Sequence, residues 1–212
     1  MTTTTSVQKS VSVATKTKKV RHLTLNQFWE KYADREDGYK YEFNNGIVEK
    51  TPRRMKIKEL HISKNIKRAF SLTEAYKNGG ELFEEVDIQT LVEQGRRPDM
   101  VYFTNDEIKQ GDIYVLPSFV IEIISDTDGI NRVNEKLLEY FEAGVKVVWH
   151  IFPKQQMVYV FTSLTNVTIC REDMNCSAAP AIADFQMSAK DIFKKELVAG
   201  LKLNNKSQID HS

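Results

Sequence analysis

The spacing of apolar residues changes along this chain, and the changes predict a mixed order of helices and strands. Residues 62–73 carry apolar side chains at helical spacing, and Gly79 and Gly80 are expected to end that helix. Residues 85–90 alternate polar with apolar side chains, which is typical of a half-buried strand. Similar patterns predict further helices over 23–32, about 131–143 and 188–197, and further strands over 100–103, 119–124, 147–152, 157–162 and 166–170.

The sequence YKYEFNNGIVEK at 39–50 has the pattern of a β-hairpin. Asn45 and Gly46 at its centre suit a turn that needs positive φ angles, and strands with apolar residues flank them. Before this hairpin, Thr24 is expected to cap the first helix through its side-chain oxygen. A short helix followed by a hairpin is therefore predicted at the start of the folded region.

Length and composition indicate one globular domain with polar ends. The chain has 212 residues, of which 41% are hydrophobic and 28% are charged, and this size favours a single domain. We expect the domain over 23–200, a disordered basic arm over 1–22 and a polar tail over 201–212. The basic arm is either a solvated tail or a source of phosphate contacts.

Charge, hydrophobicity and cysteine content limit the possible partners. Lysines and arginines number 30 against 29 aspartates and glutamates, so any contact with nucleic acid must use a local basic patch. No run of 18 apolar residues occurs in the chain, so no membrane partner is expected. Cys170 and Cys176 lack metal-ligand spacing, and they favour a reduced, cytoplasmic setting.

Two acidic residues stand at strand positions where burial is expected. Glu122 interrupts the apolar run FVIEII, so its carboxylate should lie in a desolvated place, and Asp99 stands just before the strand MVYF. A buried carboxylate needs a cation, a metal or a proton as its partner, because an unpaired one costs several kcal/mol. Each acid alone is consistent with a salt-bridged residue. Together, on neighbouring strands, they would repel each other unless a divalent cation such as Mg²⁺ or Mn²⁺ lay between them.

A lysine is a natural third group, because phosphodiester hydrolysis needs something to orient water or offset charge in the transition state. Lys136 lies about 60° from Val133 and about 40° from Tyr140 around the predicted helix, at the rim of its apolar face. From this rim its ammonium group can reach toward the preceding strand. The alternatives are an ion pair with Glu139 or a solvated side chain. The polar face of the helix is expected to carry Glu135, Glu139 and Glu142.

Three stretches in order, RRPDMVYF, PSFVIEIIS and NEKLLEYFEAGVKVVWHIFP, resemble the Uma-two restriction endonuclease family of the PD-(D/E)XK nuclease-like superfamily. The resemblance spans roughly residues 23–197 and includes YEFNNGIVE at 41–49. It implies an α/β fold with a restriction-endonuclease-like core, in which helices flank a mixed central β-sheet. It also implies a Mg²⁺ site in which Mn²⁺ can substitute, DNA as the partner, and a homodimer.

The same resemblance assigns roles to individual residues. Asp99 and Glu122 match the two acidic metal ligands of the family motif. The backbone carbonyl of Ile123 would be a further metal ligand. Lys136 matches the helix-borne lysine that replaces the lysine of the ExK motif. Glu42 matches an early family glutamate and would be a further acid of the catalytic site.

One departure from the family pattern follows the strand glutamate. Family members often have Ser-Pro there, whereas Ser125 is followed in this chain by Asp-Thr-Asp at 126–128. These acids would hold metal or water, or would cap the next helix or remain in a solvated loop, and capping or solvation is favoured. His61 falls where the family often carries a helical histidine, and a structural role is favoured for it over a catalytic base.

Phosphate contacts are expected from two basic clusters. One cluster is TPRRMKIK at 51–58, and the other is the arginine pair before Pro98. Both clusters are also consistent with ordinary solvated faces. The candidate phosphate donors are Arg53, Arg54, Lys56, Arg96 and Arg97.

The leading hypothesis is a Mg²⁺-dependent DNA endonuclease. In it Asp99 and Glu122 hold the metal, and Lys136 orients the attacking water or stabilises the phosphate. The competing hypothesis is a non-catalytic nucleic-acid-binding or assembly module that keeps the nuclease fold, which the near-neutral charge favours. RNA and single-stranded or branched DNA stay open as substrates, because no aromatic platform motif selects among them.

Overall fold

The structure is a computed structural model that describes residues 23–53, 57–111 and 115–195. The basic arm predicted over 1–22 and the polar tail predicted over 201–212 lie outside the described residues. Within the described part of the chain, no helix is both long and apolar enough to cross a membrane.

A six-stranded sheet forms the centre of the molecule, with the strand order β10-β9-β8-β7-β6-β3. β7 and β8 are parallel, and the other neighbouring pairs are antiparallel. The sheet is therefore mixed. Its strands are β3 (Glu81–Glu84), β6 (Met100–Phe103), β7 (Phe119–Ile123), β8 (Val147–Phe152), β9 (Met157–Ser163) and β10 (Asn166–Arg171).

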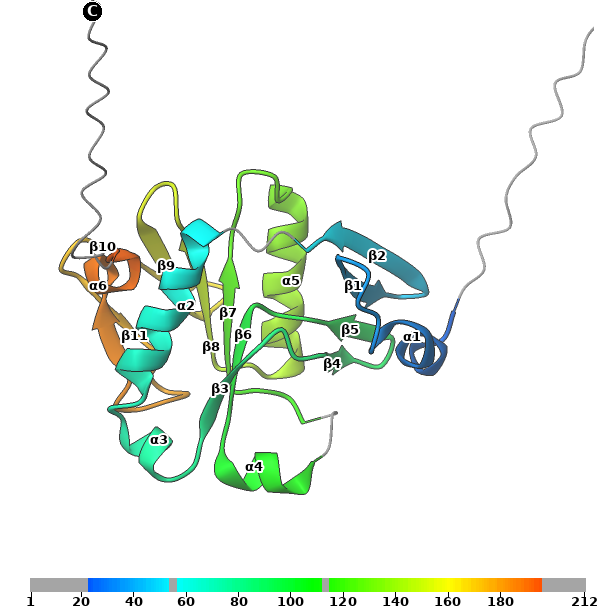
Figure 1. Cartoon of the computed structure of the whole chain (residues 1–212), viewed down its shortest axis with the longest axis horizontal. Coiled ribbons are helices and arrows are strands. Elements are labelled where there is room, and N and C mark those ends of the chain that lie inside the picture. Colours follow the sequence, from blue (N-terminus) through cyan, green and yellow to red (C-terminus); the bar gives the residue numbers. More distant parts are fainter. Residues whose placement is uncertain (1–22, 54–56, 112–114, 196–212) are drawn as a thin grey trace, which may run out of the picture.

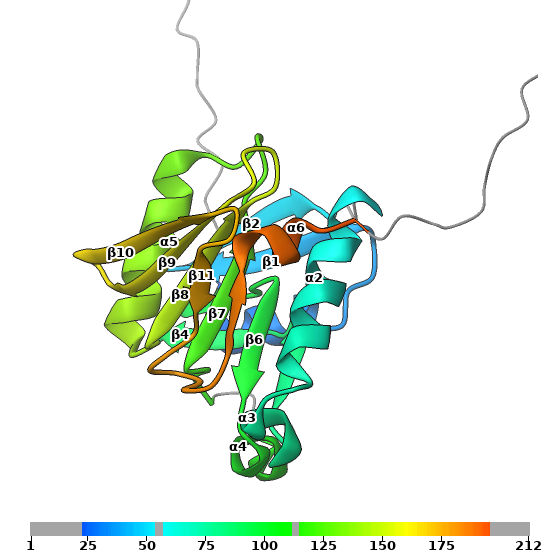
Figure 2. The same cartoon turned by 90° about the vertical axis from the view of Figure 1, so that its left-hand side faces the viewer.

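Helices cover both faces of this sheet (Figure 1). α2 (Ile57–Phe70) and α6 (Ala189–Phe193) lie on one face, and Figure 2 looks onto that side. α5 (Ile130–Ala143) lies on the other face. Side chains alternate across each strand, so that in β8 Trp149 is buried toward α2 and Val148 toward α5. The predicted α/β fold, with a mixed central sheet flanked by helices, is confirmed.

A smaller, four-stranded sheet lies beyond α5 (Figure 1), with the order β2-β1-β5-β4. All of its neighbouring strands are antiparallel. α1 (Leu25–Tyr32) packs its apolar side chains against this sheet. The strands are β1 (Tyr39–Asn44), β2 (Ile47–Pro52), β4 (Ile88–Leu91) and β5 (Gln94–Arg96).

The cap and the turn predicted at the start of the domain are both present. Thr24 caps α1 and forms a reciprocal capping box with Gln27. Asn45 and Gly46 join β1 to β2 with φ angles of 48° and 87°. Asparagine and glycine tolerate such positive angles better than other residues, which explains why the hairpin turns at this point.

β1 presents different chemistry to its two sides. Tyr41 and Phe43 are buried against α1. Because side chains alternate along a strand, Lys40 and Glu42 point to the opposite side, where they contact residues of the larger sheet and α5. The hairpin therefore carries two charged groups into the space between the sheets.

One predicted helix is divided in two. The helix expected to continue to Gly79 ends at Phe70, and a separate helix, α3 (Glu74–Lys77), follows it. Thr73 causes the break, because its side chain caps α3 by accepting a hydrogen bond from the backbone of Tyr76. The apolar period alone did not reveal this second cap.

The helix predicted over 188–197 is shorter in the structure, where α6 ends at Phe193. Several short elements were also not predicted from the sequence, because three to six residues give too few repeats to establish a period. Besides α3, these are β3, β5, α4 (Asn105–Gln110), β11 (Asn175–Ser177) and β12 (Gln186–Ser188).

The contact between β5 and α1 makes a first prediction. A Cβ added at Gly95 would lie 2.6 Å from the ring of Trp29 and 3.1 Å from Leu25. We expect Gly95→Ala to lower the free energy of unfolding by about 1–3 kcal/mol, because the indole cannot move away without disturbing α1. Urea denaturation measures this change. Gly129→Ala is the matched control, since nothing lies within 4 Å of its added Cβ, and equal losses in both variants would contradict the explanation.

Candidate active site

Asp99 and Glu122 meet at the ends of two neighbouring strands. β6 and β7 pair with Met100 opposite Ile121, and the same register continued by one residue places Asp99 opposite Glu122. Because side chains alternate along a strand, Glu122 shares the α5 side of the sheet with Val120. The larger sheet therefore brings together the two acids that the sequence analysis singled out.

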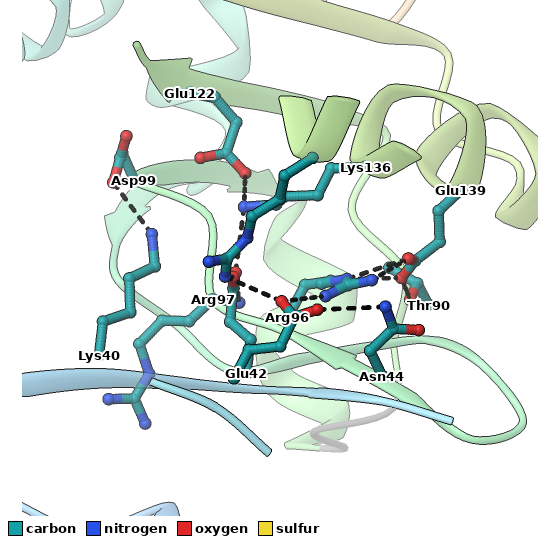
Figure 3. A network of polar contacts seen from close by, with 12 residues as sticks. Lys40, Glu42, Asn44, Thr90, Arg96, Arg97, Asp99, Glu122, Lys136 and Glu139 are labelled. Atoms are coloured by element: carbon teal, nitrogen blue, oxygen red, sulfur yellow. Dashed lines mark hydrogen bonds and ion pairs between the residues drawn. The ribbon is translucent and has the colours of Figure 1, made fainter. Parts of the chain in front are cut away.

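The carboxylate of Glu122 is buried and is bound through one of its two oxygens. Lys136 Nζ lies 2.5 Å from Oε1, and the hydroxyl of Tyr140 donates to the same oxygen at 2.6 Å. Among the described residues, none makes a hydrogen bond or ion pair to Oε2, which Figure 3 shows turned to the side where Asp99 lies. Glu122 thus has a cationic partner and keeps one oxygen for a ligand.

Asp99 is held from two directions. Its Oδ1 lies 3.2 Å from Lys40 Nζ, and its Oδ2 accepts a hydrogen bond of 2.6 Å from the backbone N–H of Ile123. The second contact ties the start of β6 to the end of β7. Ile123 therefore lies beside the two acids, while the ligand role of its carbonyl stays a prediction.

Glu42 is the most enclosed acid of the group, with 2% of its surface exposed. Its Oε1 accepts hydrogen bonds from Lys136 at 3.0 Å and from the backbone of Arg97 at 3.1 Å. Its Oε2 accepts from Arg132 at 2.6 Å. Both oxygens are engaged, so the contacts of Glu42 are those of an anchor for Lys136 and Arg132.

These groups line one cavity of about 740 Å³. His150 also lines it, beside Glu122 in the parallel register of β7 and β8. The imidazole is 3% exposed, and its Nε2 has no hydrogen-bond partner. A buried polar atom normally has a partner, so this nitrogen marks a place for a water or a ligand. The described lining carries four cations, namely Lys40, Arg53, Arg132 and Lys136, and six acids, namely Glu42, Glu84, Glu85, Asp99, Glu122 and Asp128.

Burial and neighbouring charges shift the pKa values in different directions. Burial alone would raise the pKa of Glu122, but the ammonium groups of Lys136 and Lys40 hold it below its ordinary value. Burial raises the pKa of Asp99, and Lys40 offsets only part of that effect. Burial lowers the pKa of His150 to about 4. At neutral pH the site therefore combines an ionised Glu122 with an uncharged imidazole.

The two arginines suggested as phosphate contacts are buried ion-pair partners, which corrects that prediction. Arg96 is 2% exposed and forms a two-point pair with Glu139, with contacts of 3.0 Å and 2.5 Å. Arg97 pairs with Asp87 at 2.5 Å and donates to the carbonyl of Ala33. Glu139, expected on the polar face of α5, is buried for the same reason. Neither guanidinium is open to a phosphate in this structure.

The other predicted contact residues lie at the rim of the cavity or beyond the described residues. Arg53 lines the cavity, is exposed, and forms an ion pair with Glu85. Arg54 and Lys56 fall within residues 54–56, which lie outside the described part of the chain. His61 lies on α2 and is not among the described residues that line the cavity.

The two acids of the loop after β7, Asp126 and Asp128, make contacts outside the catalytic group. Asp128 accepts a hydrogen bond of 2.7 Å from the backbone N–H of Ser125, and Asp126 forms an exposed ion pair with Lys154 at 3.2 Å. α5 begins after Gly129, without a side-chain cap. The loop role that the sequence favoured is therefore observed for these acids, and helix capping is not.

Several charged or polar groups that line or support the site were not predicted from the sequence. A signal existed for three of them. Lys40 stands two residues before Glu42 on one strand, so the two share a face, and Arg132 precedes Lys136 by one helical turn. His150, in β8, interrupts an otherwise apolar strand as Glu122 does. The missed residues are Lys40, Arg132, Tyr140 and His150.

The chemistry of these donors fits a hydrated divalent cation. Asp99 and Glu122 offer hard carboxylate oxygens to one cavity. The described residues contain no group of three or more His, Cys, Asp or Glu side chains that could enclose an ion. Two acids suffice for Mg²⁺, however, because this ion is usually held by one or two carboxylates, with water and phosphate oxygens completing its shell.

The fold matches that of a solved protein described as a nuclease. A crystal structure from Anabaena variabilis, titled as "a putative nuclease belonging to DUF820", superposes with a TM-score of 0.68 at 21% sequence identity. The match covers 81% of this chain and 97% of that chain. The two proteins therefore share one α/β fold, in which helices flank a mixed central sheet.

The family follows from a second comparison. The model of the Uma2 family, described as "Putative restriction endonuclease", matches residues 25–190. This match covers most of the 212 residues, and the chain belongs to the Uma2 family. No protein with curated annotation matches the chain at a significant level.

The anchoring role of Glu42 makes a prediction about pH. Burial would raise the pKa of Glu42, but Lys136, Lys40 and Arg132 lower it far below the ordinary value of 4.5. The stabilisation from the ionised group is then complete above pH 4.5 and is lost as the pH falls toward the folded-state value. We expect Glu42→Gln to lower the free energy of unfolding by about 3 kcal/mol at pH 7, and by less at pH 3.

Urea denaturation of both proteins across this pH range measures the difference. Glu135→Gln, which neutralises an exposed acid of α5, is the control and should change stability by less than about 0.5 kcal/mol. A loss for Glu42→Gln that stays constant from pH 7 to pH 3 would show that its charge is not what stabilises the fold.

Proposed function

We propose that this protein is a Mg²⁺-dependent endonuclease that hydrolyses phosphodiester bonds in DNA. The observation that carries the proposal is the meeting of Asp99 and Glu122, from neighbouring strands, with Lys136 in one cavity. Membership of the Uma2 family and the shared nuclease fold support the same class of reaction. The homodimer that the family resemblance implies belongs to the same proposal.

The two acids would hold the cation, and each has a suitable position. Asp99 and the open oxygen of Glu122 face the cavity, and the carbonyl of Ile123 would be the third protein ligand. A bound Mg²⁺ would lower the pKa of a coordinated water and offset charge on the phosphate. The protein supplies two fixed carboxylates for this purpose, which were ordered when the chain folded.

Lys136 would act on the same phosphate. Its ammonium group is held by Glu122 at 2.5 Å and Glu42 at 3.0 Å, in a place where solvent screens charge poorly. There it orients the attacking water or stabilises the charge that develops on the phosphate oxygens. The attacking water would lose one proton as its oxygen bonds to phosphorus, the bond to the leaving sugar oxygen would break, and that oxygen would take up one proton, so that the proton count is unchanged.

The DNA backbone would approach through the open rim of the cavity. Arg53 is an exposed cation there, and Arg54 and Lys56 follow it in the sequence as further candidate phosphate contacts. Such contacts supply affinity without reading the base sequence. The chain carries a net charge of +1, so binding would depend on this local cluster.

Removal of any one of the three central groups should slow cutting strongly. We expect Asp99→Asn, Glu122→Gln and Lys136→Ala each to slow cleavage of supercoiled plasmid by at least about 100-fold in Mg²⁺ or Mn²⁺, because each removes charge that acts in the transition state. EDTA should stop cleavage by the wild type. The rates of nicking and linearisation on gels measure the effect, with single-stranded DNA and RNA tested in parallel.

Matched controls separate a catalytic effect from a general loss of charge. Glu142→Gln and Lys146→Ala alter exposed residues at the end of α5 and just after it, and both should cut like the wild type. Circular dichroism shows whether each variant is folded. If the wild type binds metal and cuts none of these substrates, the choice of substrate is wrong. If it neither binds metal nor cuts, the enzyme proposal is wrong.

Arg53 makes a separate prediction about DNA binding. Arg53→Ala should weaken binding to duplexes of unrelated sequence by a similar factor, and should lower the slope of log affinity against log salt by about 1. Fluorescence anisotropy at several salt concentrations, with Ca²⁺ in place of Mg²⁺, measures both effects. Lys109→Ala, an exposed change on α4 outside the cavity lining, is the control. An unchanged salt slope for Arg53→Ala would exclude a phosphate contact.

A non-catalytic nucleic-acid-binding or assembly module is favoured by one observation. Each acid of the site already has a cationic partner in the protein itself, so the folded state does not require a metal. Calorimetric titration of Mn²⁺ into the wild type and Asp99→Asn separates the two functions. A site that is lost in the variant supports the nuclease, and no site at millimolar metal supports the module.

A further inference from the structure

Lys40 is a second lysine in the cavity, and the roles proposed above do not use it. It projects from β1 on the same side as Glu42, and its Nζ lies 3.2 Å from Oδ1 of Asp99. Its side chain is 16% exposed, so the ammonium group is partly open to the cavity that it lines. Figure 3 shows that Lys40 and Lys136 reach the two acids from different sides. Each candidate metal ligand therefore has its own lysine.

The two lysines are held in different ways. Lys136 contacts both Glu122 and Glu42, so it keeps an anionic partner if Glu122 turns to another ligand. Among the described residues, Asp99 is the only acid within ion-pair distance of Lys40. If Asp99 held a divalent cation, Lys40 would lose this partner and its ammonium group would be repelled by the added positive charge. Within the described part of the chain, Lys40 thus has no second ion pair to hold it when the charge of Asp99 is taken up.

A phosphate offers Lys40 a new partner in the same cavity. The scissile phosphate carries negative charge on its non-bridging oxygens, and an ammonium group binds such oxygens through charge-assisted hydrogen bonds. The long, flexible stem of lysine allows its charge to change partners without a backbone movement. Lys40 starts from a position beside one of the two proposed metal ligands, so the distance to a phosphate held there is short.

We propose that Lys40 is a second catalytic lysine, which holds Asp99 in the metal-free protein and turns to the scissile phosphate once a divalent cation occupies Asp99. The inference rests on the proposed nuclease function and adds a residue to it. In the metal-free protein Lys40 competes with the metal for Asp99, and in the complex with DNA it offsets charge on the phosphate.

The two roles predict opposite changes in two measurements. Lys40→Met keeps most of the side-chain volume and removes the charge, so we expect Mn²⁺ to bind about tenfold more tightly, because a competing cation is gone. We expect cleavage at saturating Mn²⁺ to slow about 100-fold, because a cation at the phosphate is lost. A lysine that only stabilised the fold would not produce this combination.

Calorimetric titration with Mn²⁺ gives the metal affinity, and single-turnover cleavage of plasmid at saturating Mn²⁺ gives the rate. Lys40→Arg keeps the charge and should bind Mn²⁺ within about threefold of the wild type. Lys50→Met is the matched control, because Lys50 stands on the neighbouring strand of the same hairpin and contacts the rings of Tyr39 and Tyr41 on the other side. The Mn²⁺ affinity and the cleavage rate of Lys50→Met should equal those of the wild type.

Stability decides which neutral variant is used. If Lys40→Met does not fold, Lys40→Gln replaces it, because the glutamine amide can still donate a hydrogen bond to Asp99. Unchanged or weaker Mn²⁺ binding by the neutral variant overturns the competition, and an unchanged cleavage rate overturns the phosphate contact. If the wild type binds Mn²⁺ and cuts while either result occurs, the role of Lys40 alone is wrong. If the wild type neither binds nor cuts, the nuclease function is wrong and the role of Lys40 falls with it.

Discussion

Lys136 joins three separate parts of the molecule through two buried carboxylates. It stands on α5, while Glu122 belongs to the larger sheet and Glu42 to the smaller one. An unpaired charge in such a place costs several kcal/mol, so the three elements are stable only when they meet. A second buried pair, Arg96 with Glu139, joins the smaller sheet to the same helix. The placement of the two sheets therefore depends on charge pairing as well as on apolar packing.

The same pairing produces the properties of the site. Buried acids stay ionised only near cations, and Glu42, Asp99 and Glu122 each have a lysine within ion-pair distance. Because Glu42 accepts hydrogen bonds on both oxygens, it holds Lys136 in place, whereas Glu122 keeps one oxygen open. One network can therefore contain a carboxylate that anchors Lys136, which is Glu42, and a carboxylate with an oxygen open to a ligand, which is Glu122. Their roles differ by the number of donors around each, although their chemistry is the same.

Much of the fold was predictable, and the site was predictable in part. The hairpin turn at Asn45 and the strand that carries Glu122 follow from local rules, since backbone angles and side-chain alternation involve only near neighbours in the chain. The assignment of Arg96 and Arg97 to phosphate contacts failed because a pair of basic residues looks the same whether it faces solvent or a buried acid. Glu139 was misplaced for the same reason, since its partner belongs to another element.

The sequence by itself determined the longer helices and strands, that one acid stands just before a strand and another within a strand, and that a lysine lies at the rim of the helix after them. Only the tertiary structure decided which charged side chains form ion pairs with each other. Lys40 reaches Asp99 across 59 positions of the chain, and Lys136 reaches Glu42 across 94. Helical and strand periods are set by the geometry of adjacent residues, whereas an ion pair depends on a distance between distant elements. That distance exists only after the two sheets have packed around α5.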